Sequence, residues 1–368
     1  MKPASFPLPP GAAIGILGGG QLGRMLALAA ARLGFDAAVL DPEPDAPAKR
    51  LAATAITGAY DDADALAALA EASDIITFEF ENVPARAIEI LESLGAASAP
   101  SGRALAISQD RLAEKTFLNA AGAPTVAFAR VDGPPDIAAA LSAIGRPLLV
   151  KTRRGGYDGK GQAWVEHSGE TARVFAAVGS GPAIAEAPAD FRRELSVIAA
   201  RGRDGEIALY PIGENHHEGG ILRRTFAPAA VSPRVAGQAE RIAATLLSAL
   251  DYVGVIAVEL FERDDGRLLV NEFAPRVHNS GHWTLDGCEV DQFEQHVRAI
   301  AGWPLGPTHA IAQVEMTNLI GGEANDWRRL AAEPETRLWL YGKSEVRPGR
   351  KMGHVNRLTP LRDRAPRV

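Results

Sequence analysis

The sequence contains a single cysteine, Cys288, among its 368 residues. One thiol excludes an intrachain disulfide framework, and it also excludes a metal site built from several cysteines. Aromatic residues are sparse at 6%, but hydrophobic residues reach 46% and charged residues 23%, which is ordinary for a folded globular protein. No apolar run reaches the roughly 20 residues that a membrane-spanning helix needs. The length allows two or three domains.

The chain also has no strong excess of charge of either sign. Its net charge is −6, with acidic and basic residues scattered along the sequence. This pattern argues against nucleic acid or an anionic membrane as a partner. The first residues, MKPASFPLPPG, carry too little positive charge and too many prolines for a secretory signal. We therefore expect a cytoplasmic protein.

The first chemical motif is a glycine turn near the N-terminus. An apolar run ends at Leu17 and is followed by GGGQLG and a helical pattern, and the next apolar run ends on Asp41. Gly18, Gly20 and Gly23 are in the GxGxxG register that is typical of dinucleotide-binding turns. A glycine turn at a helix N-terminus can bind any phosphate, so an NAD-dependent dehydrogenase, another phosphate ligand and an empty turn all remain open.

Polar residues follow a second predicted strand of this region. Glu81 and Asn82 come shortly after the apolar run 75–78. The carboxyl ends of strands in open α/β sheets are where such sheets bind ligands. An alternative role for both residues is to cap the next helix.

A charged helix precedes the central part of the chain. The segment QDRLAEKTFLNAA predicts a helix capped by Ser108. Its Arg111, Glu114 and Lys115 are, by themselves, typical of a solvent-exposed helix face.

The glycine-rich segment TRRGGYDGKGQ lies between two apolar runs that we predict to be strands. Because no helix follows it, this segment is neither a Walker loop nor a Rossmann turn. Its backbone N–H groups can bind phosphate oxygens, and Lys151 and Lys160 supply positive charge. A mobile surface loop is the alternative, but the density of Lys, Arg and Gly favours phosphate binding.

The segment from Val255 to Thr284 contains two apolar runs joined by RDDG, a typical hairpin turn. Glu259 interrupts the first run and Glu272 the second. Pairing symmetric about the turn would place Glu259 opposite Leu269 or Val270. The Val270 register would put Glu272 diagonally across on the same face, roughly 5–8 Å away. Such close carboxylates repel unless a cation lies between them, and hard oxygen ligands suit Mg²⁺ with substrate phosphates. The alternative is a pair of surface acids.

Further polar residues cluster after and before this hairpin. The tract APRVHNSGHWT has the composition of a binding loop because it combines Arg276, His278 and His282 with Asn and Ser. Upstream, His216 and His217 are adjacent but have no third ligand at suitable spacing, so a polar substrate contact is favoured over a metal site.

The chain resembles the ATP-grasp superfamily in a series of motifs that occur in the same order: GGGQLGRM, FEFENVP, QDRLAEKTFL, VKTRRGGYDGKGQ, ENHHEGGIL, VNEFAPRVHNSGHWT, FEQHVRAI and YGK with RPGRKMGH. Within that superfamily it is similar to the 5-(carboxyamino)imidazole ribonucleotide synthase family over about residues 15–355. The tract NEFAPRVHNSGHWT followed by EQHVRAI is the most specific, because related ATP-grasp enzymes differ there.

The resemblance implies a fold of α/β and α+β parts: a Rossmann-like domain (1–107), an ATP-grasp domain of two subdomains (108–300, with a lid at about 124–190) and a small C-terminal domain (301–368). It implies that ATP and bicarbonate form carboxyphosphate, whose carboxyl group passes to the exocyclic amine of 5-aminoimidazole ribonucleotide in purine biosynthesis, with release of ADP and phosphate. Mg²⁺ and a homodimer are also implied.

The resemblance assigns roles to individual residues. The ATP contacts would be Arg111, Lys151, Gly156, Tyr157, Asp158, Gly159, Lys160, Gly161, Gln162, Glu186, Ala187, Pro188, Ala189, Glu194, His217, Asn271 and Glu272. Glu259 and Glu272 would bind the metal, and the catalytic residues would be Lys151, Arg276 and His278, with Arg276 holding bicarbonate or carboxyphosphate. The ribonucleotide contacts would be Gln21, Leu22, Glu81, Asn82, Tyr157, Asp158, Lys343, Arg350 and Lys351.

Two departures from the superfamily pattern change these expectations. Many members have Asn two residues after the second metal Glu, but this chain has Ala274. We therefore expect two carboxylates and phosphate oxygens to hold the metal, without an amide ligand. Ala187 and Pro188 have no polar side chain, so we expect adenine to be contacted by backbone groups there.

Three other functions compete with this prediction. A different ATP-grasp ligase, such as a formate-dependent glycinamide ribonucleotide transformylase or a biotin-carboxylase-like enzyme, would share the nucleotide site. An NAD-dependent dehydrogenase leaves the loop at 155–161 and the pair Glu259 and Glu272 unexplained. A non-catalytic nucleotide-binding subunit is opposed by the intact Lys151 and Arg276.

Overall fold

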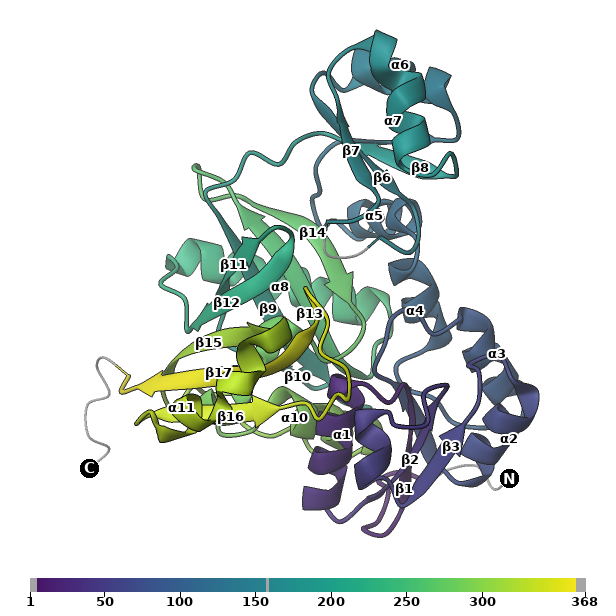
Figure 1. Cartoon of the computed structure of the whole chain (residues 1–368), viewed down its shortest axis with the longest axis vertical. Helices are drawn as coiled ribbons and strands as arrows, with labels where there is room; N and C mark the ends of the chain where they lie inside the picture. The colour runs from purple at the N-terminus through teal and green to yellow at the C-terminus, as the bar shows by residue number, and fades with distance from the viewer. Residues whose placement is uncertain (1–4, 157–158, 362–368) are drawn as a thin grey trace.

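The computed structural model describes residues 5–156 and 159–361, which form three β-sheets with helices packed against them. Tyr157 and Asp158, predicted to contact ATP and the ribonucleotide, lie outside the described residues. Figure 1 shows the N-terminal sheet in purple, a separate lid in teal, and a large sheet that continues to the C-terminus.

The N-terminal part is a four-stranded parallel sheet in the order β3-β2-β1-β4, with helices on both faces. Alternate residues of β1 face opposite layers: Ile14 and Ile16 pack with α1, and Leu17 packs with the layer of α2 and α3. This arrangement confirms the predicted Rossmann-like domain. The elements are β1 (Ala13–Leu17), α1 (Gln21–Arg32), β2 (Asp36–Asp41), η1 (Pro47–Leu51), β3 (Thr54–Thr57), α2 (Ala63–Glu71), β4 (Ile75–Phe78) and α3 (Ala85–Ser93).

Two helices, α4 (Gly102–Ser108) and α5 (Arg111–Ala120), connect this sheet to the rest of the chain. The prediction that Ser108 caps the second helix was wrong, because Ser108 is the last residue of α4. Asp110 is the cap: its carboxylate accepts hydrogen bonds from Leu112 N at 3.0 Å and Ala113 N at 3.2 Å. A carboxylate at this position satisfies N–H groups that have no partner within the helix.

The lid is a four-stranded antiparallel sheet in the order β5-β8-β6-β7, covered by α6 and α7. It stands at the top of Figure 1, beyond the body of the molecule. The glycine-rich segment joins β6 to β7, between two strands as predicted. The elements are β5 (Phe128–Val131), α6 (Pro134–Ala143), β6 (Leu148–Thr152), β7 (Gln162–Val165), η2 (Ser168–Glu170), α7 (Thr171–Ala177) and β8 (Ala183–Glu186).

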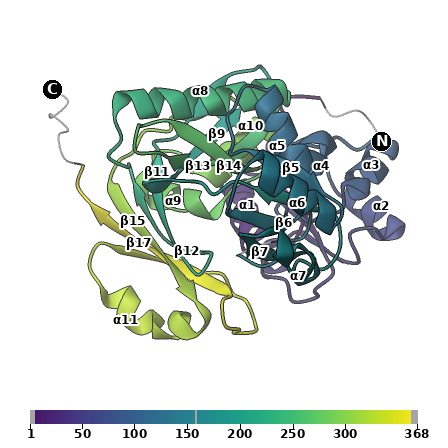
Figure 2. The same cartoon turned by 90° about the horizontal axis from the view of Figure 1, so that it is seen from above.

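The largest sheet has nine strands in the order β14-β13-β9-β11-β12-β15-β17-β16, with β10 beside β9. Val197 and Ala199 of β9 pack with α8, whereas Ile198 and Ala200 pack with α10 on the other face. Figure 2 shows α8 along one side of this sheet. Its central elements are β9 (Arg193–Arg201), β10 (Ile207–Leu209), β11 (Gly213–Glu218), β12 (Ile221–Ala227), α8 (Pro233–Ala249), β13 (Gly254–Glu262), β14 (Leu268–Ala274), η3 (Asn279–Gly281), α9 (Thr284–Gly287) and α10 (Gln292–Ala301).

The C-terminal part extends the same large sheet with three further strands. They are β15 (Gln313–Ile320), β16 (Thr336–Leu340) and β17 (Lys351–Thr359), and η4 (Gly321–Asp326) and α11 (Trp327–Ala332) lie between β15 and β16. Because β15 pairs with β12, the small C-terminal part is hydrogen-bonded to the ATP-grasp region. The exact domain limits given above stay a prediction.

The N-terminal sheet and the large sheet share one hydrophobic core. Leu22 and Leu26 of α1 belong to the same cluster as Phe293 and Val297 of α10. A buried hydrogen bond between Thr77 Oγ1 and His296 Nε2, 2.8 Å long, also joins the two parts. This packing brings the carboxyl ends of the N-terminal strands to the open end of the hairpin β13–β14.

Candidate active site

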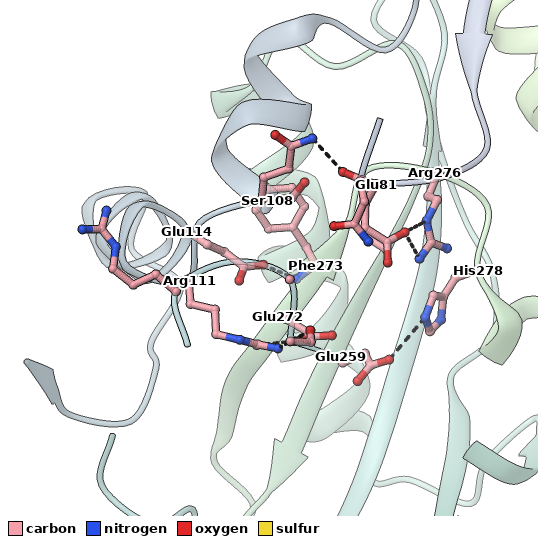
Figure 3. A pocket seen from close by; sticks show the side chains of 15 residues that line it. Glu81, Ser108, Arg111, Glu114, Glu259, Glu272, Phe273, Arg276 and His278 are labelled. Atoms are coloured by element: carbon pink, nitrogen blue, oxygen red, sulfur yellow. Dashed lines mark hydrogen bonds and ion pairs between the residues drawn. The ribbon is translucent and has the colours of Figure 1, made fainter. Parts of the chain in front are cut away.

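A polar pocket lies where the N-terminal part, the lid and the hairpin β13–β14 meet (Figure 3). Side chains from all three parts face it, including seven acids or bases that the sequence motifs singled out. The lining residues are Glu81, Asn82, Ser108, Gln109, Arg111, Glu114, Arg153, Gly155, Gly156, Glu259, Glu272, Phe273, Ala274, Arg276 and His278.

The hairpin places its two acids directly opposite each other. β13 and β14 pair antiparallel, with Glu259 opposite Glu272 and Leu260 opposite Val270. The predicted diagonal register was therefore wrong, for two reasons. The turn spans 263–267, because Glu262 pairs with Leu268, and a β-bulge between Glu259 and Leu260 shifts the register by a further residue.

The two opposed carboxylates have very different proton affinities. Burial and the neighbouring charge of Glu272 raise the pKa of Glu259 to about 7. Burial alone would also raise the pKa of Glu272, but the Arg111 guanidinium overcomes it and lowers that pKa to about 2. Arg111 Nη1 lies 2.9 Å from Glu272 Oε2. One acid is thus compensated by the protein, and the other still needs a positive partner.

Arg111 also connects the hairpin β13–β14 to the glycine-rich segment. Its Nη2 donates to Gly156 O at 3.1 Å, and its backbone N–H donates to Arg153 O at 3.0 Å. Arg153 in turn forms a bidentate ion pair with Asp110, in which Nε donates to Oδ1 at 3.0 Å and Nη2 donates to Oδ2 at 2.6 Å. The start of the glycine-rich segment is therefore fixed to the N-terminus of α5.

The helix α5 is not the solvent-exposed charged helix that its sequence suggested. Glu114 and Lys115 are only 3% and 2% exposed. Lys115 Nζ lies 3.5 Å from Glu186 Oε1, and Lys151 Nζ lies 2.7 Å from Glu186 Oε2. Arg111, Glu114, Lys115 and the buried Leu118 have the i, i+3, i+4, i+7 spacing of one helix face, which is the signal that could have revealed their burial.

The loop after β14 brings Arg276 and His278 to the opposite side of the pocket. The Arg276 guanidinium makes a very close ion pair with Glu81 and donates to Val277 O at 2.9 Å. His278 Nε2 lies 3.5 Å from Glu259 Oε1. Burial and the charge of Arg276 lower the pKa of His278 to about 3, so the imidazole is neutral at physiological pH.

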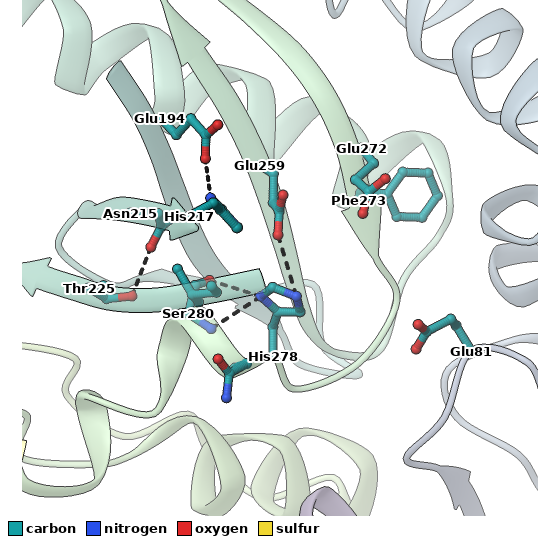
Figure 4. Close-up of polar contacts among 12 residues, drawn as sticks. Glu81, Glu194, Asn215, His217, Thr225, Glu259, Glu272, Phe273, His278 and Ser280 are labelled. Carbon is teal, nitrogen blue, oxygen red and sulfur yellow. Dashed lines mark hydrogen bonds and ion pairs between the residues drawn. The ribbon is translucent and has the colours of Figure 1, made fainter. Parts of the chain in front are cut away.

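A smaller pocket adjoins the first at Glu259 (Figure 4). Glu194 and His217 form a close ion pair on neighbouring strands there, and Asn271 hydrogen-bonds Glu259. Glu194 and His217, two of the residues that the resemblance assigned to the nucleotide, are thus brought together beside the predicted metal site. The lining residues are Glu194, Leu195, Asn215, His217, Glu259, Leu260, Phe261 and Asn271.

The glycine turn before α1 is occupied by the chain's own carboxylates. Gly19 N donates to Asp41 Oδ2 at 2.6 Å. Gly20 N and Gly23 N donate to the two oxygens of Glu79, at 2.9 and 3.0 Å. These are the N–H groups that a dinucleotide pyrophosphate would need, so the structure does not support the dehydrogenase alternative.

The described ribonucleotide contacts that we predicted fall in two places: Glu81 and Asn82 line the larger pocket, whereas Gln21 and Leu22 begin α1 at the glycine turn. Leu22 is 6% exposed and packs in the core, so its side chain is not available for a polar ligand. Lys343 Nζ donates to Lys351 O at 2.8 Å. Burial and the nearby charge of Arg350 lower the pKa of Lys343 to about 8, with Glu79 acting in the opposite direction. The C-terminal bases therefore reach the edge of the N-terminal sheet.

The segment after β8 offers fewer backbone groups than we predicted. Ala187 N is used in a hydrogen bond to Ala127 O, 2.8 Å long, and cannot donate to adenine. Pro188 has no N–H group, so Ala189 is the remaining donor of this predicted contact.

In the glycine-rich segment between β6 and β7, Gly159 and Gly161 have φ values of 75° and 71°, a conformation that favours glycine.

The described part of the chain lacks two further kinds of feature. Within residues 5–156 and 159–361, no group of three or more His, Cys, Asp and Glu side chains is arranged to hold a metal ion. Within the same part of the chain, no helix is both long and apolar enough to span a membrane.

Comparisons with known proteins match all three parts of the chain. Residues 12–109 match the ribonucleotide synthetase preATP-grasp domain, residues 116–293 the ATP-grasp domain, and residues 315–366 the phosphoribosylaminoimidazole carboxylase C-terminal domain. The chain is 51% identical to the N5-carboxyaminoimidazole ribonucleotide synthase of Brucella melitensis, over 96% of this chain and 98% of that protein.

Solved structures of the same name have closely similar folds. The N5-carboxyaminoimidazole ribonucleotide synthetase of Thermus thermophilus is 47% identical, with a TM-score of 0.89 over 94% of this chain and 93% of that one. The Aspergillus clavatus enzyme in complex with ADP and 5-aminoimidazole ribonucleotide is 33% identical, with a TM-score of 0.88 over 95% and 94%.

Proposed function

Because the chain belongs to the family of N5-carboxyaminoimidazole ribonucleotide synthases, we propose that it carboxylates 5-aminoimidazole ribonucleotide at the expense of ATP. The resemblance inferred from the motifs is thereby confirmed at the level of the family and of the fold. The chain is an ATP-grasp carbon–nitrogen ligase of purine biosynthesis.

The reaction has two group transfers. A bicarbonate oxygen attacks the γ-phosphorus of ATP, the bond to the β-phosphate oxygen breaks, and ADP leaves. The exocyclic amine nitrogen of the ribonucleotide then attacks the carboxyl carbon of carboxyphosphate. The C–O bond to phosphate breaks, the nitrogen loses a proton to the departing phosphate, and the product is the carbamate.

The observation that carries this proposal is the opposed pair Glu259 and Glu272 beside Arg111, in one pocket with Arg276. The donor set fits Mg²⁺, since both acids are hard oxygen ligands and Glu259 has no cationic partner of its own in the hairpin. Ala274 supplies no amide, so phosphate oxygens would complete the shell as expected. Mg²⁺ bound there would neutralise the phosphate charge that develops during phosphoryl transfer.

The nucleotide would be held between the hairpin and the lid. Arg111 and Lys151 are the cations for the phosphates, and both are already held in place by carboxylates, Glu272 and Glu186. The segment from Gly156 to Gln162 would cover the phosphates. Glu194 and His217 lie at the smaller pocket beside Glu259, which suits contacts to the ribose.

Arg276 is placed to hold bicarbonate and then carboxyphosphate. Its planar guanidinium suits a planar oxyanion, and it lies across the pocket from the metal acids. Glu81 keeps the guanidinium in this orientation through a close ion pair. His278, neutral and adjacent to Glu259, would hydrogen-bond the same anion. Carboxyphosphate hydrolyses readily, so closure of the lid over this pocket would protect it from water.

The ribonucleotide would bind on the N-terminal side, with its phosphate near the bases of the C-terminal part. Lys343 Nζ donates to the backbone carbonyl oxygen of Lys351, and the charge of Lys343 interacts with Glu79. The full proposed set is Gln21, Leu22 (through its backbone), Glu81, Asn82, Tyr157, Asp158, Lys343, Arg350 and Lys351.

The same resemblance favours a homodimer in the cytoplasm. Sedimentation at several protein concentrations tests the dimer, and a single species with the mass of one chain would contradict it.

A steady-state assay with omission of each substrate tests the proposed reaction. ADP release should require 5-aminoimidazole ribonucleotide and bicarbonate together. ADP release that depends on formate and glycinamide ribonucleotide would instead identify the related transformylase. Binding of NADH without binding of ATP would favour the dehydrogenase.

A further inference from the structure

Three charged side chains of one helix contact three consecutive residues of β14. Arg111 Nη1 lies 2.9 Å from the Glu272 carboxylate. On either side of Glu272, Glu114 Oε1 accepts from Phe273 N at 2.8 Å, and Lys115 Nζ donates to Asn271 O at 3.2 Å. Figure 3 shows the Glu114 carboxylate directed at the Phe273 backbone. We call this set of hydrogen bonds the α5 contact.

The residues held by the α5 contact include the bulge that creates the carboxylate pair. Leu260 pairs with Val270 and Glu259 with Glu272, so Asn271 is the extra residue and lies opposite no residue of β13 in the register. Without the bulge, the register of Leu260 and Val270 would place Glu259 opposite Asn271. The bulge is therefore the reason that two acids face each other, and bulges are common beside active sites for this purpose.

A bulge in this position needs support from outside the sheet. β14 is an edge strand, and its outward N–H and C=O groups have no neighbouring strand. At the bulge, Lys115 supplies a donor and Glu114 an acceptor, as a further β-strand would. Both side chains are almost fully buried, so water cannot readily replace them. The spacing 111, 114, 115 puts all three charges of α5 on one helix face.

We propose that Glu114 and Lys115 are positioning residues, which stabilise the bulge at Asn271 and so hold the Glu272 carboxylate opposite Glu259. This inference rests on the proposed function, because it assigns the supporting groups of the proposed Mg²⁺ site. Nothing in the family resemblance or in the motifs assigned a role to either residue.

Lys115 extends the same support to the phosphate-binding lysine. Its Nζ is 3.5 Å from one oxygen of Glu186, whose other oxygen is 2.7 Å from Lys151 Nζ. The side chain of Lys115 thus connects the edge of the large sheet to β8 of the lid. Loss of Lys115 disturbs both the metal acids and Lys151, whereas loss of Glu114 disturbs the metal acids alone.

The test compares variants of the full-length chain that differ in hydrogen bonding at one atom. Glu114→Met keeps the side-chain length but removes the acceptor of Phe273 N–H, whereas Glu114→Gln retains an oxygen acceptor. Lys115→Met removes the donor to Asn271 O. Leu118→Ala is the matched control, because it loosens the packing of the same helix but removes no hydrogen bond to 271–273. The probe is Mn²⁺ titrated by electron paramagnetic resonance in the presence of ADP, with circular dichroism to confirm folding.

Glu114→Met and Lys115→Met should raise the dissociation constant of Mn²⁺ about 10- to 100-fold, the usual effect of losing a group that orients a metal ligand. Glu114→Gln should restore most of the affinity. Leu118→Ala should lower the melting temperature but keep the affinity. In addition, Lys115→Met should weaken ADP binding without metal, which Glu114→Met should not do.

The proposal is overturned if Glu114→Met binds Mn²⁺ as the unmutated chain does. It is also overturned if Leu118→Ala weakens Mn²⁺ binding to the same extent, because general loosening of α5 would then explain both. If Glu114→Met does not fold, Lys115→Met takes its place in the test. The proposal is then overturned if Lys115→Met binds Mn²⁺ as the unmutated chain does, or if Leu118→Ala weakens Mn²⁺ binding as much as Lys115→Met does. Failure of the unmutated chain to bind Mn²⁺ with ADP would contradict the proposed function, not the role of α5.

Discussion

At the scale of single residues, the central feature is the environment of Glu272, which contains one acid and one base. It faces Glu259 across the hairpin, and its carboxylate accepts a hydrogen bond from Arg111. Arg111 therefore keeps Glu272 ionised, while Glu259 has a raised pKa and gains most from a bound cation. This asymmetry suits the proposed site, in which bound Mg²⁺ and ATP would complete the charge balance.

Glu272→Gln should reduce Mg²⁺-dependent ATP turnover by at least about 10²-fold, because an amide is a weaker ligand and leaves Arg111 without its anion. The far-ultraviolet circular dichroism should be unchanged. In the unmutated chain, Mg²⁺ with ADP should raise the melting temperature by mass action, and a chelator should remove this effect. Near-normal turnover by Glu272→Gln would show that the carboxylate pair is structural.

Arg276→Lys should lower kcat/KM for bicarbonate by about 10²-fold while leaving ADP affinity unchanged. Lysine keeps the charge but not the planar fork that contacts Glu81 and would hold the planar anion. Initial rates at varied bicarbonate, together with calorimetric titration of ADP, provide the measurement. An equal loss of ADP affinity would indicate that Arg276 serves the nucleotide instead.

Among the elements, α5 is the one whose role the sequence revealed least. Its N-terminus is fixed by Asp110, which caps the helix and holds Arg153 of the phosphate loop. Local pattern predicted the helix itself and the strands of the hairpin, since both follow from periodicity and turn residues. The bulge at Asn271 and the partners of Lys115 depend on contacts between distant segments, which a local pattern does not encode.

Asp110→Ala should destabilise the protein by about 1–2 kcal/mol through loss of the cap, and it should also raise KM for ATP because Arg153 loses its partner. Asp110→Asn should keep most of the stability, since asparagine caps helices well, but should still raise KM for ATP. Urea unfolding and initial rates measure the two effects separately. An equal KM for all three proteins would mean that Arg153 does not position the phosphate loop.

Across the whole molecule, the active site depends on a shared core between the N-terminal part and the large sheet. The motifs predicted three parts and most of the pocket, and the structure brings Glu81, Glu259, Glu272, Arg276 and His278 together. They did not predict that Glu79 and Asp41 would occupy the glycine turn, because the strands that carry these acids approach it only in the folded sheet.

Two buried histidines at the junctions between the parts should make stability depend on pH. Burial lowers the pKa of His296 and of His354 to about 3, from a usual value of 6.5. Between these values the unfolded chain binds protons that the folded chain does not. The free energy of unfolding should therefore fall as pH drops from about 6.5 toward 3, by up to about 1.4 kcal/mol per pH unit for each histidine.

Urea unfolding at several pH values measures this slope. His296→Gln should make the slope smaller, whereas the same change at the exposed His309 serves as the control and should leave it unchanged. An unaltered slope in His296→Gln would show that the buried imidazole is not responsible.

The central claim is that ATP and bicarbonate react with each other in the pocket of Glu259, Glu272 and Arg276. Turnover in [¹⁸O]bicarbonate, followed by mass analysis of the inorganic phosphate, tests it most directly. If carboxyphosphate forms, each phosphate released should carry an ¹⁸O atom from bicarbonate, and Arg276→Lys should reduce labelled and total phosphate together. Phosphate without ¹⁸O, formed while the ribonucleotide is carboxylated, would contradict the account.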